Sequence, residues 1–258
     1  MNKINYHDID FNELTKLNVE SSESSIYVDK KRKRLYKIFK TRDLTELFDK
    51  SEKLDLLVQK NHIRMIVPDT KIINYGCFVG TVEEYINGVD LSDIFKKYDN
   101  INDIMGIFIK SSIALEEIHK EEIAVADLHA GNIRIDENGN PYYLDALSCC
   151  IGDKENNMIS YLLYDYLKEK GIQIQKVTKE MDKLSFMLMT YTLLCQNTFD
   201  ETKELDFNSR FTRLKYLKNL LGIFELIESS EDNIDVPYLH EIIKPNHTKK
   251  YKKEMREY

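Results

Sequence analysis

The change of pattern near Asn87-Gly88 limits the fold of this 258-residue chain more than any other feature. Short runs rich in β-branched and aromatic residues come before it, and long apolar stretches with helical spacing come after it. Asn-Gly is itself a turn signal. We therefore predict an α+β fold with two lobes: a β-rich N-terminal lobe, residues 1–86, with one helix, and a mainly helical C-terminal lobe, residues 87–258.

The N-terminal part contains two predicted β-hairpins with a helix between them. IYVD (26–29) and RLYKIF (34–39) flank a short basic segment and form the first hairpin. The runs TKIINYG and CFVGTVEEYI meet at Tyr75-Gly76 and form the second. Asp43 begins the stretch DLTELFDKSEKLDLLVQK and stands in the position of a helix cap. These patterns predict a small sheet and a single helix.

The C-terminal part is expected to be built around long helices. The first covers 103–120, and the segment 181–195, which is apolar nearly all round, is predicted to be a buried central helix. Segments 210–229 and 236–243 supply closing helices. Between the first two helices, IRI and YYL flank Asn138-Gly139, which predicts a hairpin.

Composition narrows the class of protein. Hydrophobic residues make up 42% of the chain and charged residues 31%, as in globular proteins. The net charge of −7 argues against a nucleic-acid binder, and no apolar run approaches the roughly 20 residues of a membrane helix. The N-terminus lacks the features of a secretory signal, so we expect a cytoplasmic protein. The four cysteines show no metal-binding spacing, and the oligomeric state is not indicated.

Three polar residues around the predicted hairpin 133–144 suggest chemistry. The hairpin places Asn132 and Asp145, which flank it, at the same open end. An amide oxygen beside a carboxylate suits magnesium when phosphate oxygens complete its coordination. Asp127 lies on the preceding loop, where a carboxylate can accept a proton from an attacking hydroxyl. Taken singly, each residue is equally compatible with an ordinary turn or cap.

The segment ADLHAGN followed by YLDALS resembles the catalytic segment of the protein kinase superfamily. In that family a D-x-x-x-x-N loop precedes a hairpin and a magnesium-binding D-F-G. The resemblance assigns the catalytic role to Asp127 and the metal-binding role to Asn132 and Asp145. The D-L-H-x-G-N form also resembles aminoglycoside phosphotransferases and other small-molecule kinases, so it leaves the acceptor open.

Further matches imply a nucleotide site, and together the matches run from about residue 18 to residue 194. YKIFK resembles the strand that carries the phosphate-binding lysine, which implies this role for Lys37. The resemblance implies that a glutamate on the following helix pairs with this lysine. We predict Glu52 for this partner, with Glu46 as the alternative.

Two other segments complete the resemblance. VEEYINGVDL resembles the strand that leads into the family's hinge, so the backbone around Glu84 and Ile86 is implied to bind adenine. Glu83 then stands at the back of the pocket, an unusual place for a charged residue. KEMDKLSFMLMTYTLL resembles the central helix whose aspartate, here Asp182, bonds the backbone of the catalytic loop.

The sequence also departs from the family. The segment 19–28 has no glycine where the family has its Gly-rich loop. Ala126 replaces the arginine before the catalytic aspartate, and Ala146 replaces the phenylalanine of D-F-G. No A-P-E motif lies between Asp145 and Asp182. His129 stands where protein kinases often carry a lysine.

These motifs imply a phosphotransferase that uses ATP and magnesium, and we predict a divergent serine/threonine protein kinase. Its partner is then a protein or small-molecule hydroxyl acceptor, with no nucleic acid and no membrane span. The first alternative is a small-molecule kinase, because fold resemblance does not fix the acceptor. The second is a nucleotide-binding pseudokinase that acts as an interaction module.

Overall fold

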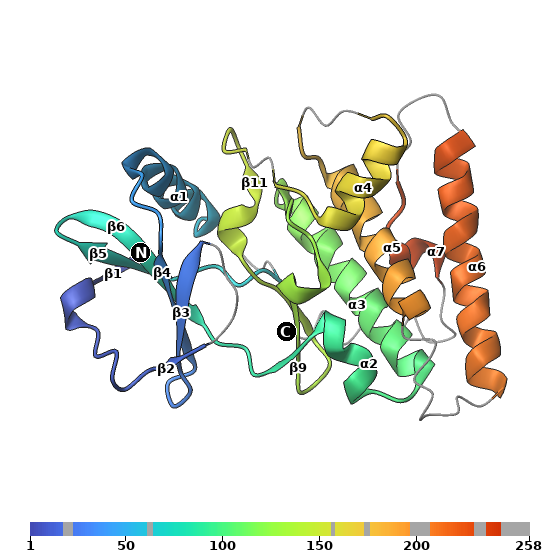
Figure 1. Cartoon of the computed structure of the whole chain (residues 1–258), viewed down its shortest axis with the longest axis horizontal. Helices are drawn as coiled ribbons and strands as arrows, with labels where there is room; N and C mark the ends of the chain where they lie inside the picture. The colour runs from blue at the N-terminus through green and yellow to red at the C-terminus, as the bar shows by residue number, and fades with distance from the viewer. Residues whose placement is uncertain are drawn as a thin grey trace.

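The computed structural model describes residues 1–17, 23–60, 64–155, 158–172, 176–196, 207–229 and 236–243. It is a mixed α/β structure in which a β-rich N-terminal region is followed by a mainly helical region (Figure 1). The main elements are β1 (Asn2–Asn5), β2 (Thr15–Lys16), β3 (Ser24–Asp29), β4 (Arg34–Phe39), α1 (Leu44–Leu57), β5 (Thr70–Asn74), β6 (Cys77–Glu84), β7 (Gly88–Asp90), α2 (Ile94–Lys97), α3 (Ile101–Lys120), β8 (Ile123–Ala124), β9 (Ile133–Asp136), β10 (Pro141–Tyr143), β11 (Cys150–Ile151), α4 (Tyr161–Glu169), α5 (Lys179–Gln196), α6 (Phe207–Ser229) and α7 (Leu239–Ile242). Short 3-10 turns lie at Tyr6–Asp8 (η1), Leu91–Asp93 (η2), Ala130–Asn132 (η3) and Ala146–Ser148 (η4).

The N-terminal region forms one sheet of six strands in the order β1-β5-β6-β4-β3-β2. Both predicted hairpins are confirmed: β3 pairs antiparallel with β4, and β5 with β6. The second turn has positive φ at Tyr75 and Gly76, as a tight hairpin turn requires. The order also places β4 directly beside β6, which is not its neighbour in sequence. This non-local pairing brings residues of the two strands together at the cleft described below.

Helix α1 begins as the sequence predicts. The Asp43 carboxylate accepts a hydrogen bond from the backbone N–H of Thr45 at 2.9 Å, a cap that stabilises a helix by about 1 kcal/mol. The helix buries Leu54 and Leu57 and contacts β6. It also contacts the turn η4 and the strand β11 of the second region. Helix α1 is therefore held by contacts with the six-stranded sheet and by contacts with the second region.

The predicted hairpin around Asn138-Gly139 is confirmed as β9 and β10, and β7 pairs with β9 on its other side. Gly88, at the start of β7, lies so close to β9 that an added Cβ atom would be 2.0 Å from the carbonyl oxygen of Ile135. Only glycine permits this approach. The crossing from the six-stranded sheet into the second region therefore depends on Gly88.

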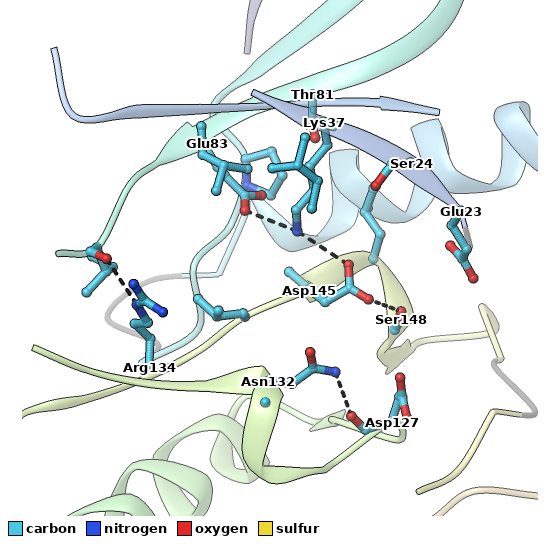
Figure 2. A pocket seen from close by; sticks show the side chains of 18 of the residues that line it. Glu23, Ser24, Lys37, Thr81, Glu83, Asp127, Asn132, Arg134, Asp145 and Ser148 are labelled. Carbon is cyan, nitrogen blue, oxygen red and sulfur yellow. Dashed lines mark hydrogen bonds and ion pairs between the residues drawn. The ribbon is translucent and has the colours of Figure 1, made fainter. Parts of the chain in front are cut away.

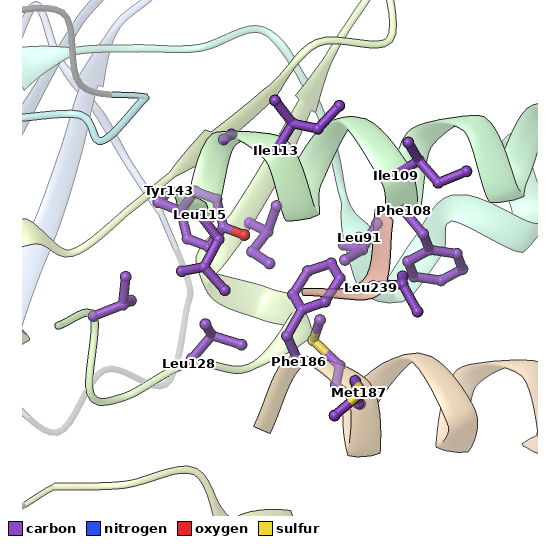
Figure 3. Close-up of a cluster of buried hydrophobic side chains, with 14 of the residues drawn as sticks. Leu91, Phe108, Ile109, Ile113, Leu115, Leu128, Tyr143, Phe186, Met187 and Leu239 are labelled. Carbon is purple, nitrogen blue, oxygen red and sulfur yellow. The ribbon is translucent and has the colours of Figure 1, made fainter. Parts of the chain in front are cut away.

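The main hydrophobic core lies in the second region. Figure 3 shows Phe108, Ile109 and Leu115 of α3 together with Phe186 and Met187 of α5, all of them buried. The two helices cover the residues predicted for them, and α5 is the buried central helix that was expected. No helix in the described ranges combines the length and the apolar character needed to cross a membrane.

Candidate functional site

A cleft of about 570 Å³ lies where the six-stranded sheet meets the helical region. Its lining includes six of the residues predicted for the site: Lys37, Glu84, Ile86, Asp127, Asn132 and Asp145. Figure 2 shows Lys37 reaching down from the sheet toward Asp145, while Asp127 and Asn132 lie on the opposite wall. The fold thus gathers residues from positions 37 to 145 around one polar cavity.

Lys37 is the link between the two walls of the cleft. Its Nζ lies 3.1 Å from Glu83 Oε1 and 3.4 Å from Asp145 Oδ1. Burial opposes the charged form of Lys37, but the two carboxylates outweigh this effect and raise the pKa of the ammonium group. Lys37 is therefore a fixed cation in the cleft.

The predicted partner of Lys37 is wrong. Glu52 instead contacts Lys154, with its Oε2 2.6 Å from the Lys154 Nζ, and it does not line the cleft. The alternative, Glu46, pairs with Lys50 at 2.9 Å. The physical reason is the orientation of α1, whose buried face presents leucines and Lys53 rather than a glutamate.

Lys53 fixes the position of α1 in a way that the sequence did not indicate. Its ammonium donates hydrogen bonds to the backbone carbonyls of Leu147, at 3.1 Å, and Cys149, at 2.7 Å. Burial lowers the pKa of Lys53. The segment that directly follows Asp145 is therefore tied to helix α1 by a lysine.

Asp145 has an unusual backbone conformation, with φ of 59° in the left-handed region. Ser148 Oγ donates to its Oδ2 at 2.6 Å, while its Oδ1 faces Lys37. Burial raises the pKa of this carboxyl, but the Lys37 charge and the Ser148 hydrogen bond outweigh that effect, so the net pKa is lowered. Asp145 is thus held as a carboxylate.

Asp127 and Asn132 lie on the loop below Lys37. The Asn132 Nδ2 donates to the backbone carbonyl of Asp127 at 3.0 Å, which leaves the amide oxygen directed toward Asp145 in Figure 2. Leu144 N donates to Asn132 O at 2.8 Å, so the hairpin brings Asn132 and Asp145 together as predicted. Burial and the nearby charge of Asp145 raise the pKa of Asp127, although His129 opposes this shift.

His129 is oriented by its own loop. Its Nδ1 accepts a hydrogen bond from the backbone N–H of Gly131 at 3.1 Å. Nε2 lies 3.8 Å from Asp127 Oδ2. The bond from Gly131 favours the tautomer with its proton on Nε2, which faces the carboxylate.

Asn132 and Asp145 supply two oxygen atoms that suit magnesium when a bound ligand completes its coordination. Within the described ranges, no group of three or more histidine, cysteine, aspartate and glutamate side chains could hold a metal ion. One amide oxygen and one carboxylate fit Mg²⁺, which usually takes one or two protein carboxylates and completes its coordination with water and phosphate oxygens.

Asp182 lies outside the cleft and supports the loop that carries Asp127 from behind. This carboxylate is 1% exposed and accepts hydrogen bonds from the backbone N–H groups of Val125 and Ala126, the latter at 3.0 Å. The predicted bonding of Asp182 to this loop is therefore present. Ala126 has φ of 66°, so these bonds stabilise a strained backbone.

A chain of hydrogen-bond contacts links Asp182 to the C-terminal part of the described chain. His119 Nε2 lies 3.0 Å from Asp182 Oδ2, and His119 Nδ1 lies 2.8 Å from the hydroxyl of Tyr238. Sequence reasoning missed His119 and Tyr238. A histidine at the end of a buried helix was a weak signal, whereas Tyr238 carried none.

The predicted adenine-binding segment lies at the cleft edge. Glu84 of β6 lies opposite Arg34 of β4 at the end of the ladder between these two strands. The carbonyl of Ile86 accepts a hydrogen bond from Arg134 Nε at 3.3 Å, so this acceptor already has a protein partner. Residues 19–22 of the glycine-free segment 19–28 lie outside the described residues.

The structure and site define a mixed α/β protein with a polar cleft between a sheet and a helical region. Comparison with known proteins adds no family: no protein-family model matches the chain, and a search of curated proteins finds no match. What the cleft does must therefore be inferred from its residues.

Proposed function

We propose that this protein is an ATP- and magnesium-dependent phosphotransferase with a bilobal, protein-kinase-like fold, and that it acts on serine or threonine hydroxyls. The proposed lobes are residues 1–86 and 87–258. The observation that carries the proposal is the contact of Lys37 with Asp145, residues separated by 108 positions, above a loop that presents Asp127 and Asn132. Phosphoryl transfer needs this set of a cation, two metal-binding oxygens and a carboxylate.

Each residue has a specific task in this proposal. Lys37 neutralises and positions phosphate oxygens, and Asn132 and Asp145 hold magnesium. The bound magnesium supplies charge neutralisation to the phosphates. Asp127 orients the acceptor hydroxyl and accepts its proton while the new O–P bond forms. The bond to the leaving phosphate of ATP breaks, and ADP is released. Most of the catalysis is positioning and electrostatics.

Backbone strain supports the placement of the site. Ala126 and Asp145 are two of the few non-glycine residues with positive φ in the described ranges, and they lie on opposite sides of the catalytic segment. Such conformations cost about 1–3 kcal/mol each and concentrate at functional sites. The conformation of Ala126 sets the direction of the next residue, Asp127, and the conformation of Asp145 sets the direction of its own side chain.

The decisive experiment is transfer of radiolabelled phosphate from ATP in the presence of magnesium. Purified protein is incubated with generic protein acceptors and with a panel of hydroxyl metabolites, beside the Asp127→Asn variant. We expect label on protein serine or threonine, with a loss of roughly 100-fold or more in the variant. The matched control is Asp103→Asn, an exposed aspartate on α3, which should retain full activity.

The other outcomes decide against parts of the proposal. Label on a metabolite alone would replace the protein acceptor by a small molecule. A thermal shift with magnesium and ATP, but no transfer to any acceptor, would favour the pseudokinase. Transfer that survives Asp127→Asn would contradict the role of Asp127.

A further inference from the structure

The Lys37–Glu83 contact is built into the sheet. Strands β4 and β6 are hydrogen-bonded neighbours, with Lys37 opposite Thr81 and Leu35 opposite Glu83. Because side chains alternate along a strand, Thr81 and Glu83 share the face that carries Lys37. Glu83 is the diagonal neighbour of Lys37, within reach of a long side chain. Figure 2 shows both side chains on the cleft side of the sheet.

Glu83 is buried in a way that only pairing can stabilise. The residue is 2% exposed and lies in a strand whose neighbouring positions are mostly apolar or small. Its Oε1 faces Lys37, and its Oε2 has no hydrogen-bond partner in the described part of the chain. An isolated buried carboxylate is strongly unfavourable. Burial raises the pKa of Glu83, and the Lys37 charge 3.1 Å away opposes this shift, so Lys37 is the compensating partner of this carboxyl.

Helix α1 offers no competing carboxylate for Lys37. Glu46 is bound to Lys50 and Glu52 to Lys154, so neither contacts Lys37. The buried lysine of the helix, Lys53, bonds carbonyls of the following segment. The charge that holds Lys37 thus comes from the neighbouring strand and not from the helix.

We infer that Glu83 is the positioning residue for Lys37, and that the orientation of Lys37 is set within the sheet, independently of helix α1. The inference rests on the proposed function for its catalytic meaning. Lys37 has three N–H donors; Glu83 takes one permanently, and the others serve Asp145 and a phosphate oxygen. We therefore expect the Lys37–Glu83 contact to persist when α1 is displaced, because no residue of α1 takes part in it.

The physical part of the inference is tested by thermal melting, without nucleotide. Glu83→Gln and Lys37→Met each remove one member of a buried pair, and we expect each to lower Tm by roughly 6–15 °C. The double variant Lys37→Met/Glu83→Gln removes both charges of the pair and leaves only Asp145 without its Lys37 contact, so its Tm should fall by less than the sum of the two single losses. Glu52→Gln should change Tm by less than about 2 °C. In a double variant with Lys37→Met, the two changes in Tm should simply add.

The functional part is tested by separating the KM values of the two substrates. Glu83→Gln should raise KM for ATP roughly tenfold or more while KM for the acceptor stays unchanged, and Glu52→Gln should change neither. If Glu83 had a purely structural role, the substitution would change the KM values of both ATP and the acceptor.

The failures are distinguishable. Additive melting effects of positions 37 and 83, or a large effect of Glu52→Gln on KM for ATP, would overturn the inference. Absence of any transfer by the wild type would overturn the proposed function, while the melting cycle would still decide the pairing. If Glu83→Gln does not fold, the double variant and Lys37→Met supply the comparison.

Discussion

The two walls of the cleft are held by different forces. On the sheet side, Lys37 is fixed by the side-chain charges of Glu83 and Asp145. On the helical side, the loop before Asp127 is fixed through its backbone, by hydrogen bonds to the buried carboxylate of Asp182. The first wall depends on the identity of its charged residues. The second wall depends on one hydrogen-bond acceptor, the carboxylate of Asp182, and tolerates changes in the side chains of the loop.

This difference explains how the loop keeps its shape with small apolar residues before Asp127. The bonds to Asp182 come from the backbone N–H groups of Val125 and Ala126, which any residue but proline supplies. Small apolar side chains at these positions are therefore compatible with the loop conformation. The sheet wall has no such freedom, because Lys37 and Glu83 contact each other through their charged ends.

The largest effect is expected for Asp182→Ala. The substitution leaves buried donors on Val125, Ala126 and His119 without an acceptor, and we expect the free energy of unfolding to fall by about 3–5 kcal/mol. Denaturant titration measures this loss. The exposed control Asp103→Ala should lose no more than about 0.5 kcal/mol. A loss below 1 kcal/mol for Asp182→Ala would show that the loop is held by other contacts.

A smaller effect is expected for Lys53→Met, which tests the tie between α1 and the segment after Asp145. Methionine preserves the volume but removes the donors to the carbonyls of Leu147 and Cys149, at a cost of about 2 kcal/mol. Chemical unfolding is again the measurement. Lys154→Met, which removes a more exposed lysine, should leave the midpoint of unfolding nearly unchanged. A variant as stable as wild type would mean that burying the ammonium group cancels its hydrogen bonds.

Tyr238→Phe should cost still less, about 1 kcal/mol, because it removes one hydroxyl from the His119 contact and preserves the ring. Its effect should disappear in a His119→Ala background if the two residues act through one contact. Equal losses in both backgrounds, measured by urea unfolding, would contradict a link from Tyr238 to the loop.

The smallest effect is expected for Ser148→Ala, which removes a donor to the carboxylate of Asp145. Given the proposed activity, the magnesium concentration for half-maximal rate should rise roughly threefold, because a partly exposed carboxylate loses one of its orienting bonds. The KM for the acceptor should not change. An unaltered magnesium requirement would separate Ser148 from the proposed metal site.

Local signals in the sequence predicted much of the fold. Asp43 is the cap of α1, Tyr75-Gly76 turns the second hairpin, and Asn138-Gly139 lies in the turn between β9 and β10. Each depends on residues a few positions apart, where turn and capping chemistry act directly. The strand β1 was not predicted, since its polar sequence NKIN shows no alternation and its stability comes from parallel pairing with β5.

The part of the site that lies on one continuous segment could be predicted from the sequence. The part that depends on the order of strands in the sheet could not. Asp127, Asn132 and Asp145 flank one hairpin, so their spacing brought them together. The partner of Lys37 depends on β4 lying next to β6, which no local pattern specifies. A glutamate within an apolar strand was the available signal, because a buried charge requires a partner.

The contact between His119 and Tyr238 also has a consequence for biosynthesis. The two residues are 119 positions apart in the chain. At a translation rate of roughly 5–20 residues per second, Tyr238 is added roughly 6–24 s after His119. By then, all the proposed catalytic residues and Asp182 have been synthesised. Asp182 is thus synthesised, together with the loop residues Val125 and Ala126, before the tyrosine that contacts His119.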